Sequence, residues 1–169
     1  MAFSPAGLAA LFDEHAGGLY RYAVVILADP AAAEDAVQEA FVRLAIVLDR
    51  RPRFQPTIPY LRTIVRNECY SLLRKRRRLA GTPASGALLE RVSPEATEEE
   101  RLLLESALRV LPPEQREVVY LKVFEGLTFD EIATATGVPL NTAASRYRYA
   151  MDALRKVLGV RLVTHQGKT

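Results

Sequence analysis

GLTFDEIATATGVPLNTAASRYRYA, residues 126–150, is the stretch that decides the fold of the C-terminal third of the chain. Thr128 and Glu131 have the spacing of a capping box, in which each side chain bonds to an amide left open at a helix start. Gly137 suits the left-handed residue that ends this helix, and Pro139 suits the start of the next one. Two helices joined by a tight turn in this order predict a helix-turn-helix.

The second helix of this motif carries polar side chains that suit DNA. In a helix-turn-helix the second helix enters the major groove and presents its N-terminal side chains to base edges. Arginine pairs with guanine or phosphate, and asparagine pairs with adenine. A helical hairpin with solvated arginines is the alternative, but the capping box, glycine turn and basic second helix together favour DNA binding. The candidate residues are Asn141, Thr142, Ser145, Arg146 and Arg148.

Charge is strongly segregated along the chain, although the formal net charge is only +3. Residues 50–78 contain ten basic residues and one acidic residue, and residues 141–169 contain six and one. Residues 1–49 contain two basic and seven acidic residues, and residues 79–140 contain five and eleven. Two basic segments separated by acidic ones predict two surfaces that face phosphate groups.

The N-terminal half repeats apolar residues at helical spacing, with an expected break between two helices at Gly17-Gly18. Asp29 and Pro30 form a good start signal for a further helix that reaches about Leu48, because Asp caps the first turn and Pro needs no amide partner there. One stripe of this helix is expected to face the core, and it consists of Val37, Phe41, Leu44 and Leu48. Outside the stripe lie Asp35, Gln38, Glu39 and Val42.

A proline-rich loop through Pro59 precedes a long basic helix, predicted at about Tyr60 to Leu79. A run of cations is often only a solvated helix end, so the basic residues 74–78 are a weak signal by themselves. Several polar residues, however, share one helix face beside an aromatic ring, which suits a phosphate backbone or an unstacked base. These candidate DNA-binding residues are Tyr60, Arg62, Arg66, Asn67 and Arg74.

The 169 residues are 49% hydrophobic and 25% charged, which is the composition of a chain that folds around a core. No stretch of any length alternates as a strand does, so the predicted fold class is all-α. Residues 80–97 are rich in small and acidic residues and predict a flexible linker. The sequence therefore predicts two small helical domains, 1–79 and 98–160, followed by a tail at 161–169.

Other classes of function find little support in the sequence. Cys69 is the single cysteine, which fits a reducing compartment, and no apolar run is long enough to span a membrane. We therefore expect a cytoplasmic protein. No phosphate loop, metal cluster or nucleophile–base set stands out, so we expect no catalytic residue, no metal and no cofactor. An enzyme whose site assembles from distant residues stays as an alternative.

Five motifs, in their order and separations, resemble the extracytoplasmic-function (group IV) sigma factors of the sigma-70 family. They are DPAAAEDAVQEAFVRL at 29–44, YLRTIVRNE at 60–68, the basic run at 74–78, LPPEQREV at 111–118 and GLTFDEIA at 126–133. The match spans nearly the whole chain. The resemblance implies a sigma-2 domain and a sigma-4 domain joined by a variable linker, in a non-enzymatic factor that directs RNA polymerase core to particular promoters.

The resemblance also implies roles for particular residues and partners. A segment that binds the clamp helices of the largest polymerase subunit is matched by Asp35, Gln38, Glu39, Phe41 and Val42. The loop and helix from Phe54 to Asn67 match the part that melts and reads the −10 element, without nucleotide hydrolysis. The second helix of the helix-turn-helix matches the −35 reader. The implied partners are RNA polymerase core, through the clamp helices and flap of its large subunits, promoter DNA and an anti-sigma factor.

The chain departs from the family pattern at two places. It has no tryptophan, which the family often carries in and before the −10 region, and offers Tyr60, Ile46 and the Arg51–Pro59 loop instead. It also has Ala143-Ala144 where many members carry Val-Lys. A repressor or activator that binds an operator by itself is the remaining alternative, and it predicts a two-fold symmetric footprint. That alternative gives no role to the acidic helix or to the first basic segment.

Overall fold

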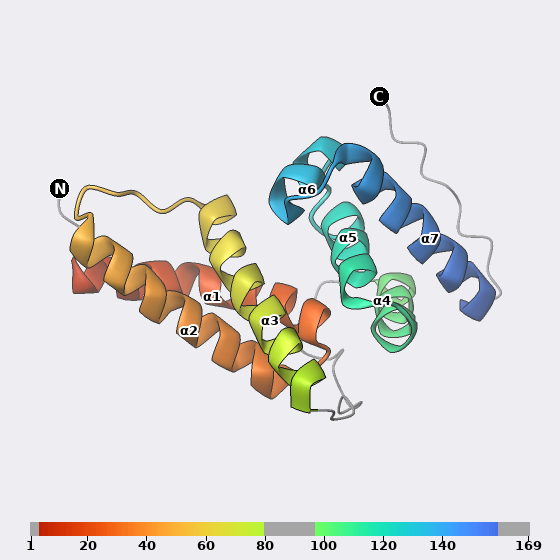
Figure 1. The fold of residues 1–169 in the computed structure, drawn as a ribbon, viewed down its shortest axis with the longest axis horizontal. Coiled ribbons are helices and arrows are strands. Elements are labelled where there is room, and N and C mark those ends of the chain that lie inside the picture. Colours follow the sequence, from red (N-terminus) through yellow and green to blue (C-terminus); the bar gives the residue numbers. More distant parts are fainter. Residues whose placement is uncertain (1–3, 80–96, 159–169) are drawn as a thin grey trace. The chain divides into compact units, whose positions relative to one another are not determined.

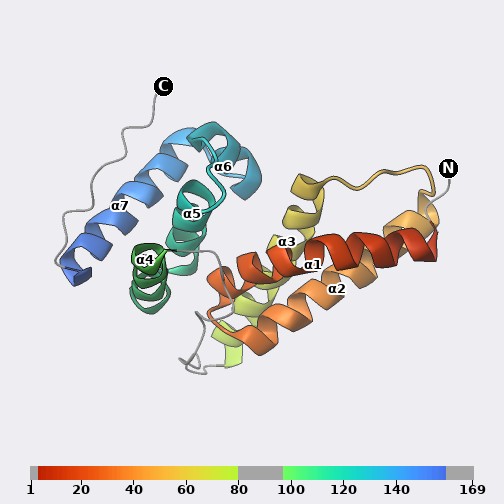
Figure 2. The same cartoon turned by 180° about the vertical axis from the view of Figure 1, so that it is seen from behind.

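A computed structural model of the chain describes residues 4–79 and 97–158, and the regular structure of these residues is helical throughout (Figures 1 and 2). The predicted all-α fold is confirmed for this part of the chain. The chain divides into two compact units, Met1–Pro94 and Glu95–Thr169. Apart from Thr97, the predicted linker 80–97 lies outside the described residues, as does the predicted tail 161–169.

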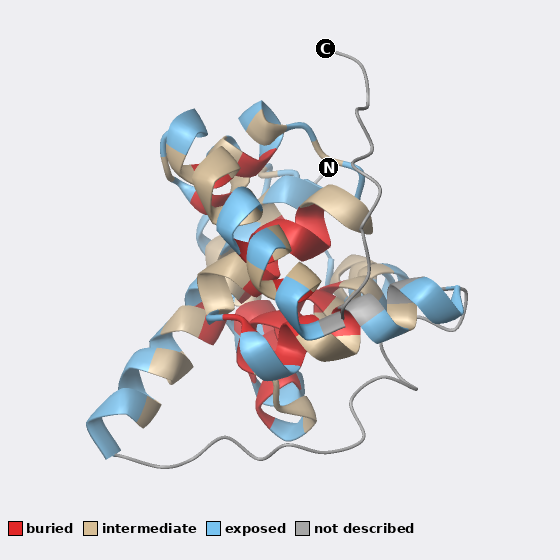
Figure 3. Ribbon diagram, turned by 90° about the vertical axis from the view of Figure 1, so that its right-hand side faces the viewer, coloured by how far each residue is buried: buried red, intermediate tan, exposed pale blue. Residues whose placement is uncertain are grey.

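The described part of the N-terminal unit consists of α1 (Pro5–Leu27), α2 (Pro30–Arg50) and α3 (Ile58–Leu79). Each of these helices packs against the other two. Residues 22–27 at the end of α1 are all buried. Figure 3 colours the ribbon by burial, with buried residues in red and exposed residues in pale blue. The core supplied by the other two helices includes Ala33, Val37, Phe41, Leu44, Leu48, Leu61, Val65 and Cys69.

The expected helix break at Gly17-Gly18 is wrong, because α1 continues through both glycines. A glycine inside a helix costs about 1 kcal/mol relative to alanine. The apolar run from Tyr22 to Leu27 lies on the same helix and is almost completely removed from water, with exposures of 0–2%. Burial of large apolar side chains stabilises by about 1.5–3 kcal/mol each, so tertiary packing outweighs the local preference of the two glycines.

The start of α2 agrees with the sequence prediction. The Ala32 amide donates to Asp29 Oδ1 at 3.1 Å, and Pro30 occupies the first turn. The predicted core stripe is confirmed, since all four of its members are buried. The side chains predicted to lie outside the stripe, Asp35, Gln38, Glu39 and Val42, are all exposed.

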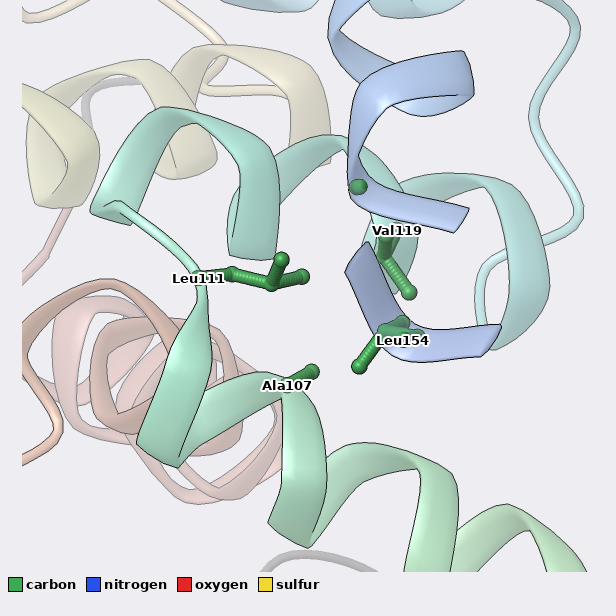
Figure 4. Close-up of a cluster of buried hydrophobic side chains, with 5 residues drawn as sticks. Ala107, Leu111, Val119 and Leu154 are labelled. Atoms are coloured by element: carbon green, nitrogen blue, oxygen red, sulfur yellow. The ribbon is translucent and has the colours of Figure 1, made fainter. Parts of the chain in front are cut away.

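The described part of the C-terminal unit consists of α4 (Glu98–Val110), α5 (Pro113–Val123), α6 (Phe129–Thr136) and α7 (Leu140–Leu158). Helix α7 packs against each of the other three. Figure 4 shows the buried cluster that joins α4, α5 and α7, which is formed by Ala107, Leu111, Val119, Ala150 and Leu154. Tyr147 packs on the edge of this cluster. Because Ala150 and Leu154 of α7 belong to the cluster, the cluster sets which face of α7 is exposed.

Candidate nucleic-acid and partner interfaces

Helices α6 and α7 form the predicted helix-turn-helix. The Glu131 amide donates to Thr128 Oγ1 at 3.2 Å, and the Thr128 amide donates to Glu131 Oε2 at 2.7 Å, so the capping box is confirmed. The hydrogen bonds that the Thr128 amide and the Thr128 hydroxyl donate to the Glu131 carboxylate hold the pKa of that carboxyl below its usual value. Gly137 has a φ of +68°, the left-handed conformation that glycine adopts without strain, and it ends α6 as predicted.

The five DNA candidates on α7 differ in how open they are to a partner. Asn141 and Arg148 are exposed, and they lie opposite the buried residues of the helix, Ala143, Ala150 and Leu154. The other three candidates, Thr142, Ser145 and Arg146, are half-buried. The Arg148 guanidinium lies 5.2 Å from the centre of the exposed Tyr149 ring. Among the five candidates, the most accessible are therefore at the first and third turns of α7.

The candidates on α3 are spread over a wider face than their spacing suggested. Asn67 and Arg74 are exposed, whereas Arg62 and Arg66 are half-buried. The Arg62 guanidinium lies 5.9 Å from the centre of the Tyr22 ring, which is buried, so Arg62 stands at the border with α1 rather than in the middle of the exposed face. The structure therefore places Arg62 at the edge of the helix face that the sequence predicted for these residues.

Aromatic rings lie at the start and in the middle of the same helix. The Phe54 and Tyr60 rings meet edge to face with centres 4.8 Å apart, at the end of the loop that precedes α3. The Arg66 guanidinium lies 4.5 Å from the centre of the Tyr70 ring. Sequence reasoning did not single out Tyr70, although its position four residues after Arg66 places both on one side of the helix.

One arginine of the basic run is held by a partner within the fold. Arg76 Nη2 lies 2.5 Å from Asp29 Oδ2, which joins the end of α3 to the start of α2. Partial burial raises the pKa of Asp29, but the Ala32 amide and the Arg76 guanidinium outweigh this effect and hold the pKa below 3.8. The other members of the run, Arg74, Lys75, Arg77 and Arg78, are exposed and face solvent.

Two arginines of this run are expected to behave differently when they are replaced. Arg76→Ala removes the partner of Asp29 and lowers the urea concentration at the unfolding midpoint, whereas Arg78→Ala leaves that midpoint unchanged. Because the folded pKa of Asp29 is depressed, its contribution is present above the unfolded pKa and is lost as the pH falls through the folded value. The difference between the two variants should therefore shrink on acidification. Equal midpoints at neutral pH would contradict this assignment.

The exposed face of α2 joins acidic and apolar side chains. Asp35, Gln38 and Glu39 are exposed near its N-terminal half, and Val42 and Ile46 follow on the same side with 55% and 50% of their surface exposed. Phe41 does not belong to this face: only 7% of it is exposed, and its ring meets Phe12 edge to face with centres 4.9 Å apart. The expected contact of Phe41 with a partner is therefore corrected to a core role.

An ion-pair network connects this face of α2 with α3. Arg43 Nε lies 3.3 Å from Glu39 Oε1 and 2.8 Å from Glu68 Oε1. Glu68 is the one acidic residue between Arg50 and Arg78, and it is buried.

The described residues include no group of three His, Cys, Asp or Glu side chains placed to hold a metal ion. Within the same residues, no helix has the length and apolar character to cross a membrane.

A helix-turn-helix with an exposed polar face, and a separate basic helix that carries aromatic rings, define a DNA-binding transcription factor. Sigma-70 region 2 matches residues 11–79, and Sigma-70, region 4 matches residues 101–154. The chain is 34% identical to the ECF RNA polymerase sigma factor SigL of Mycobacterium tuberculosis, over 88% of this chain and 87% of the relative. It is 32% identical to the RNA polymerase sigma factor CarQ of Myxococcus xanthus, with the same coverage.

Two solved structures have the same fold. One is the sigma factor RpoE in complex with the anti-sigma factor NepR from Bartonella quintana, with a TM-score of 0.71, 22% identity, and coverage of 90% of this chain and 96% of that one. The other is CnrH in complex with the cytosolic domain of CnrY, with a TM-score of 0.62, 23% identity, and coverage of 92% and 90%. The chain belongs to the extracytoplasmic-function RNA polymerase sigma factors, which direct the polymerase to specific promoters.

Proposed function

We propose that the two units divide promoter recognition between them. Residues 1–79 bind polymerase core and read and open the −10 element, residues 98–160 read the −35 element, and residues 80–97 link the two. The observation that carries this proposal is the presence of one polar, cation-bearing helix face in each unit, on α3 and on α7. Two such faces suit an asymmetric, bipartite DNA site better than a symmetric operator.

On the −35 element, Asn141 and Arg148 are proposed to reach base edges in the major groove. Their exposure and their position opposite the core of α7 support this role. Side chains that are half-buried reach less far, so Thr142, Ser145 and Arg146 are proposed to contact the phosphate backbone, which fixes the register of the helix on the duplex.

On the −10 element, α3 is proposed to hold the phosphate backbone of an opened strand through Arg66, Asn67 and Arg74. Arg62 contributes at the border of this surface. Tyr60, braced by the Phe54 ring, offers an aromatic face to an unstacked base, a role for which the family often uses tryptophan. In this proposal binding energy opens the DNA, without nucleotide hydrolysis, and the chain has no catalytic activity of its own.

The exposed face of α2 is proposed to bind the clamp helices of the polymerase through Asp35, Gln38, Glu39 and Val42. Its carboxylates suit a basic partner, and Val42 gives an apolar centre beside them. We also propose an anti-sigma factor as a partner that holds the free protein inactive in the cytoplasm. Both structural neighbours were solved with partners, NepR and the cytosolic domain of CnrY.

Run-off transcription with purified core polymerase, on the promoter upstream of this protein's own gene, tests the proposal. We expect specific initiation that depends on the protein, and a loss of roughly 5- to 100-fold for Arg148→Ala because one base contact is removed. Arg109→Ala is the matched control, since Arg109 is exposed on α4 and pairs only within that helix in the contacts described. Initiation with the control should equal that of the wild type.

A charge-reversal variant separates polymerase binding from DNA recognition. Asp35→Lys is expected to lose initiation because it no longer binds core, whereas Arg148→Ala still binds core in a pull-down. Asp35 is exposed, so the reversal should leave the unfolding midpoint unchanged. A wild-type protein that neither binds core nor supports initiation, and that protects a symmetric DNA site alone, would replace this proposal with a standalone regulator.

A further inference from the structure

Lys122 is a half-buried cation in the last turn of α5, and it lies outside the residues proposed above for polymerase and DNA. Its ammonium group donates to the Leu127 carbonyl oxygen at 3.2 Å, in the turn that leads to α6. The same nitrogen lies 4.8 Å from the centre of the Phe129 ring, close enough for a cation–π interaction. Phe129 is the first residue of α6, so one side chain of α5 holds both the turn and the start of the helix-turn-helix.

The charge of Lys122 also acts on the capping box of α6. The pKa of the Glu131 carboxyl is lowered first by the hydrogen bonds from Thr128 and then by the positive charge of Lys122. A carbonyl oxygen, a ring and a carboxylate all attract a cation, and the nearby carboxylate repels a phosphate. The surroundings of Lys122 therefore suit an internal contact better than a direct contact with DNA.

The Phe129 ring extends this series of contacts to α7. It meets the Tyr147 ring with the centres 5.6 Å apart and the planes at 64°. Tyr147 is half-buried, its burial raises the pKa of its hydroxyl, and it packs against the cluster that joins α4, α5 and α7. In the sequence, Tyr147 stands between Arg146 and Arg148. Contacts therefore run from α5, through the start of α6, to the middle of the helix proposed to read DNA.

We propose that Lys122 is a positioning residue for −35 recognition, which holds Phe129 against Tyr147 and so sets the angle between α6 and α7. The proposal rests on the proposed role of α7 as the −35 reader, and it gives α5 a part in that role. In a helix-turn-helix the first helix crosses the DNA backbone while the second lies in the major groove. The angle between the two helices therefore decides where the side chains of α7 meet the bases.

A change in this angle should affect base recognition more than overall DNA affinity. Hydrogen bonds to base edges need donor–acceptor distances of about 2.7–3.2 Å and weaken steeply when their angles deviate. The attraction between a cation and a phosphate falls only gradually with distance. We therefore expect the loss of the Lys122 ammonium to reduce the discrimination between promoters.

The test measures how strongly the complex of this protein with core polymerase discriminates between two DNA fragments. One is the promoter upstream of this protein's own gene, and the other is the same fragment with its −35 bases scrambled. Lys122→Met keeps an unbranched side chain without the ammonium, and it should lower the ratio of the two affinities about fivefold or more, the lower end of the range for one base contact. Lys122→Arg keeps a cation and its donors, so it should retain most of the ratio.

Further variants separate positioning from stability. Phe129→Leu removes the ring but keeps an apolar side chain, and it should lower the ratio as Lys122→Met does. The double variant should lose no more than the larger single loss, because the two residues act in one series of contacts. Leu104→Val shortens a buried side chain of α4, so it should lower the urea midpoint and leave the ratio unchanged. Far-UV circular dichroism checks that each variant is folded at the temperature of the assay.

Several outcomes would overturn the positioning role. They are wild-type discrimination by Lys122→Met, additive losses in the double variant, and an equal fall of the ratio in Leu104→Val. An equal loss of affinity for both fragments, with a weaker dependence on salt, would show that Lys122 contacts a phosphate instead. Absence of discrimination by the wild-type complex would overturn the proposed role of α7 itself.

Discussion

Replacement of Leu154 by alanine is expected to unfold much of the C-terminal unit and to abolish transcription that depends on the −35 element. Leu154 has no exposed surface, and it meets Ala107, Leu111 and Val119 in the cluster that joins α7 to α4 and α5. Truncation of a buried leucine to alanine costs about 2–5 kcal/mol. A single core in a unit of this size rarely supplies more than about 3–5 kcal/mol, so the loss approaches the whole stability of the unit.

Urea unfolding followed by far-UV circular dichroism measures this effect, since the chain has no tryptophan to report by fluorescence. Val157→Ala is the matched control: Val157 lies on the same helix with 53% of its surface exposed, and its truncation should change stability by less than about 0.5 kcal/mol. The helical signal of the N-terminal unit should persist in Leu154→Ala. A midpoint equal to that of the control would show that the cluster does not hold α7.

Helix ends were predictable from the sequence because the signals that set them are local. Asp29 caps α2 through an amide three residues away, and Thr128 and Glu131 cap α6 in the same way. Gly137 ends α6 through its own backbone conformation. Each of these interactions spans at most one helical turn, so the residues that decide them are neighbours in the printed sequence.

The sequence predictions that differ from the structure concern features that are not local. They depend on contacts between residues that are distant in the sequence. The break expected at Gly17-Gly18 is absent because the later part of the same helix is buried against α2 and α3. Phe41 has the spacing both of the core stripe and of the partner-binding segment, and its contact with Phe12 decides for the core. No pattern within either helix contains that information.

The same limit applies to the charged residues of the candidate DNA surface. Arg76 looks like its neighbours in a run of five cations, but it bonds to Asp29, forty-seven residues earlier in the chain. Arg62 has the spacing of a surface residue, yet it lies over the buried ring of Tyr22. Sequence alone therefore located the two basic surfaces, whereas the fold decides which cations on them are available to DNA.

The ion pair between Arg43 and Glu68 leads to the second large effect expected in this protein. Arg43→Met leaves the Glu68 carboxylate, whose side chain is only 9% exposed, without the guanidinium at 2.8 Å. Breaking a buried pair costs about 3–5 kcal/mol. The Arg43 side chain is 58% exposed, so solvent offsets part of this cost and we expect a loss of about 2–4 kcal/mol for the N-terminal unit.

A double substitution tests whether the uncompensated carboxylate causes that loss. Arg43→Met combined with Glu68→Leu removes both charges, and replacement of a buried pair by apolar side chains of similar volume is often neutral or stabilising. The double variant should therefore unfold at a higher urea concentration than Arg43→Met alone. Arg109→Met, which breaks an exposed pair with Glu105 within one helix, is the control and should cost about 0.3–0.5 kcal/mol.

The outcome of this cycle also bears on how polymerase and DNA binding are connected within the N-terminal unit. Arg43 lies between Glu39, on the face of α2 proposed for the polymerase, and Glu68, on the helix proposed for the −10 element. If the double variant is stable but initiates poorly with core polymerase, Arg43 connects the two surfaces in addition to stabilising the fold. If the double variant is as unstable as Arg43→Met, the arginine stabilises the unit through contacts other than Glu68.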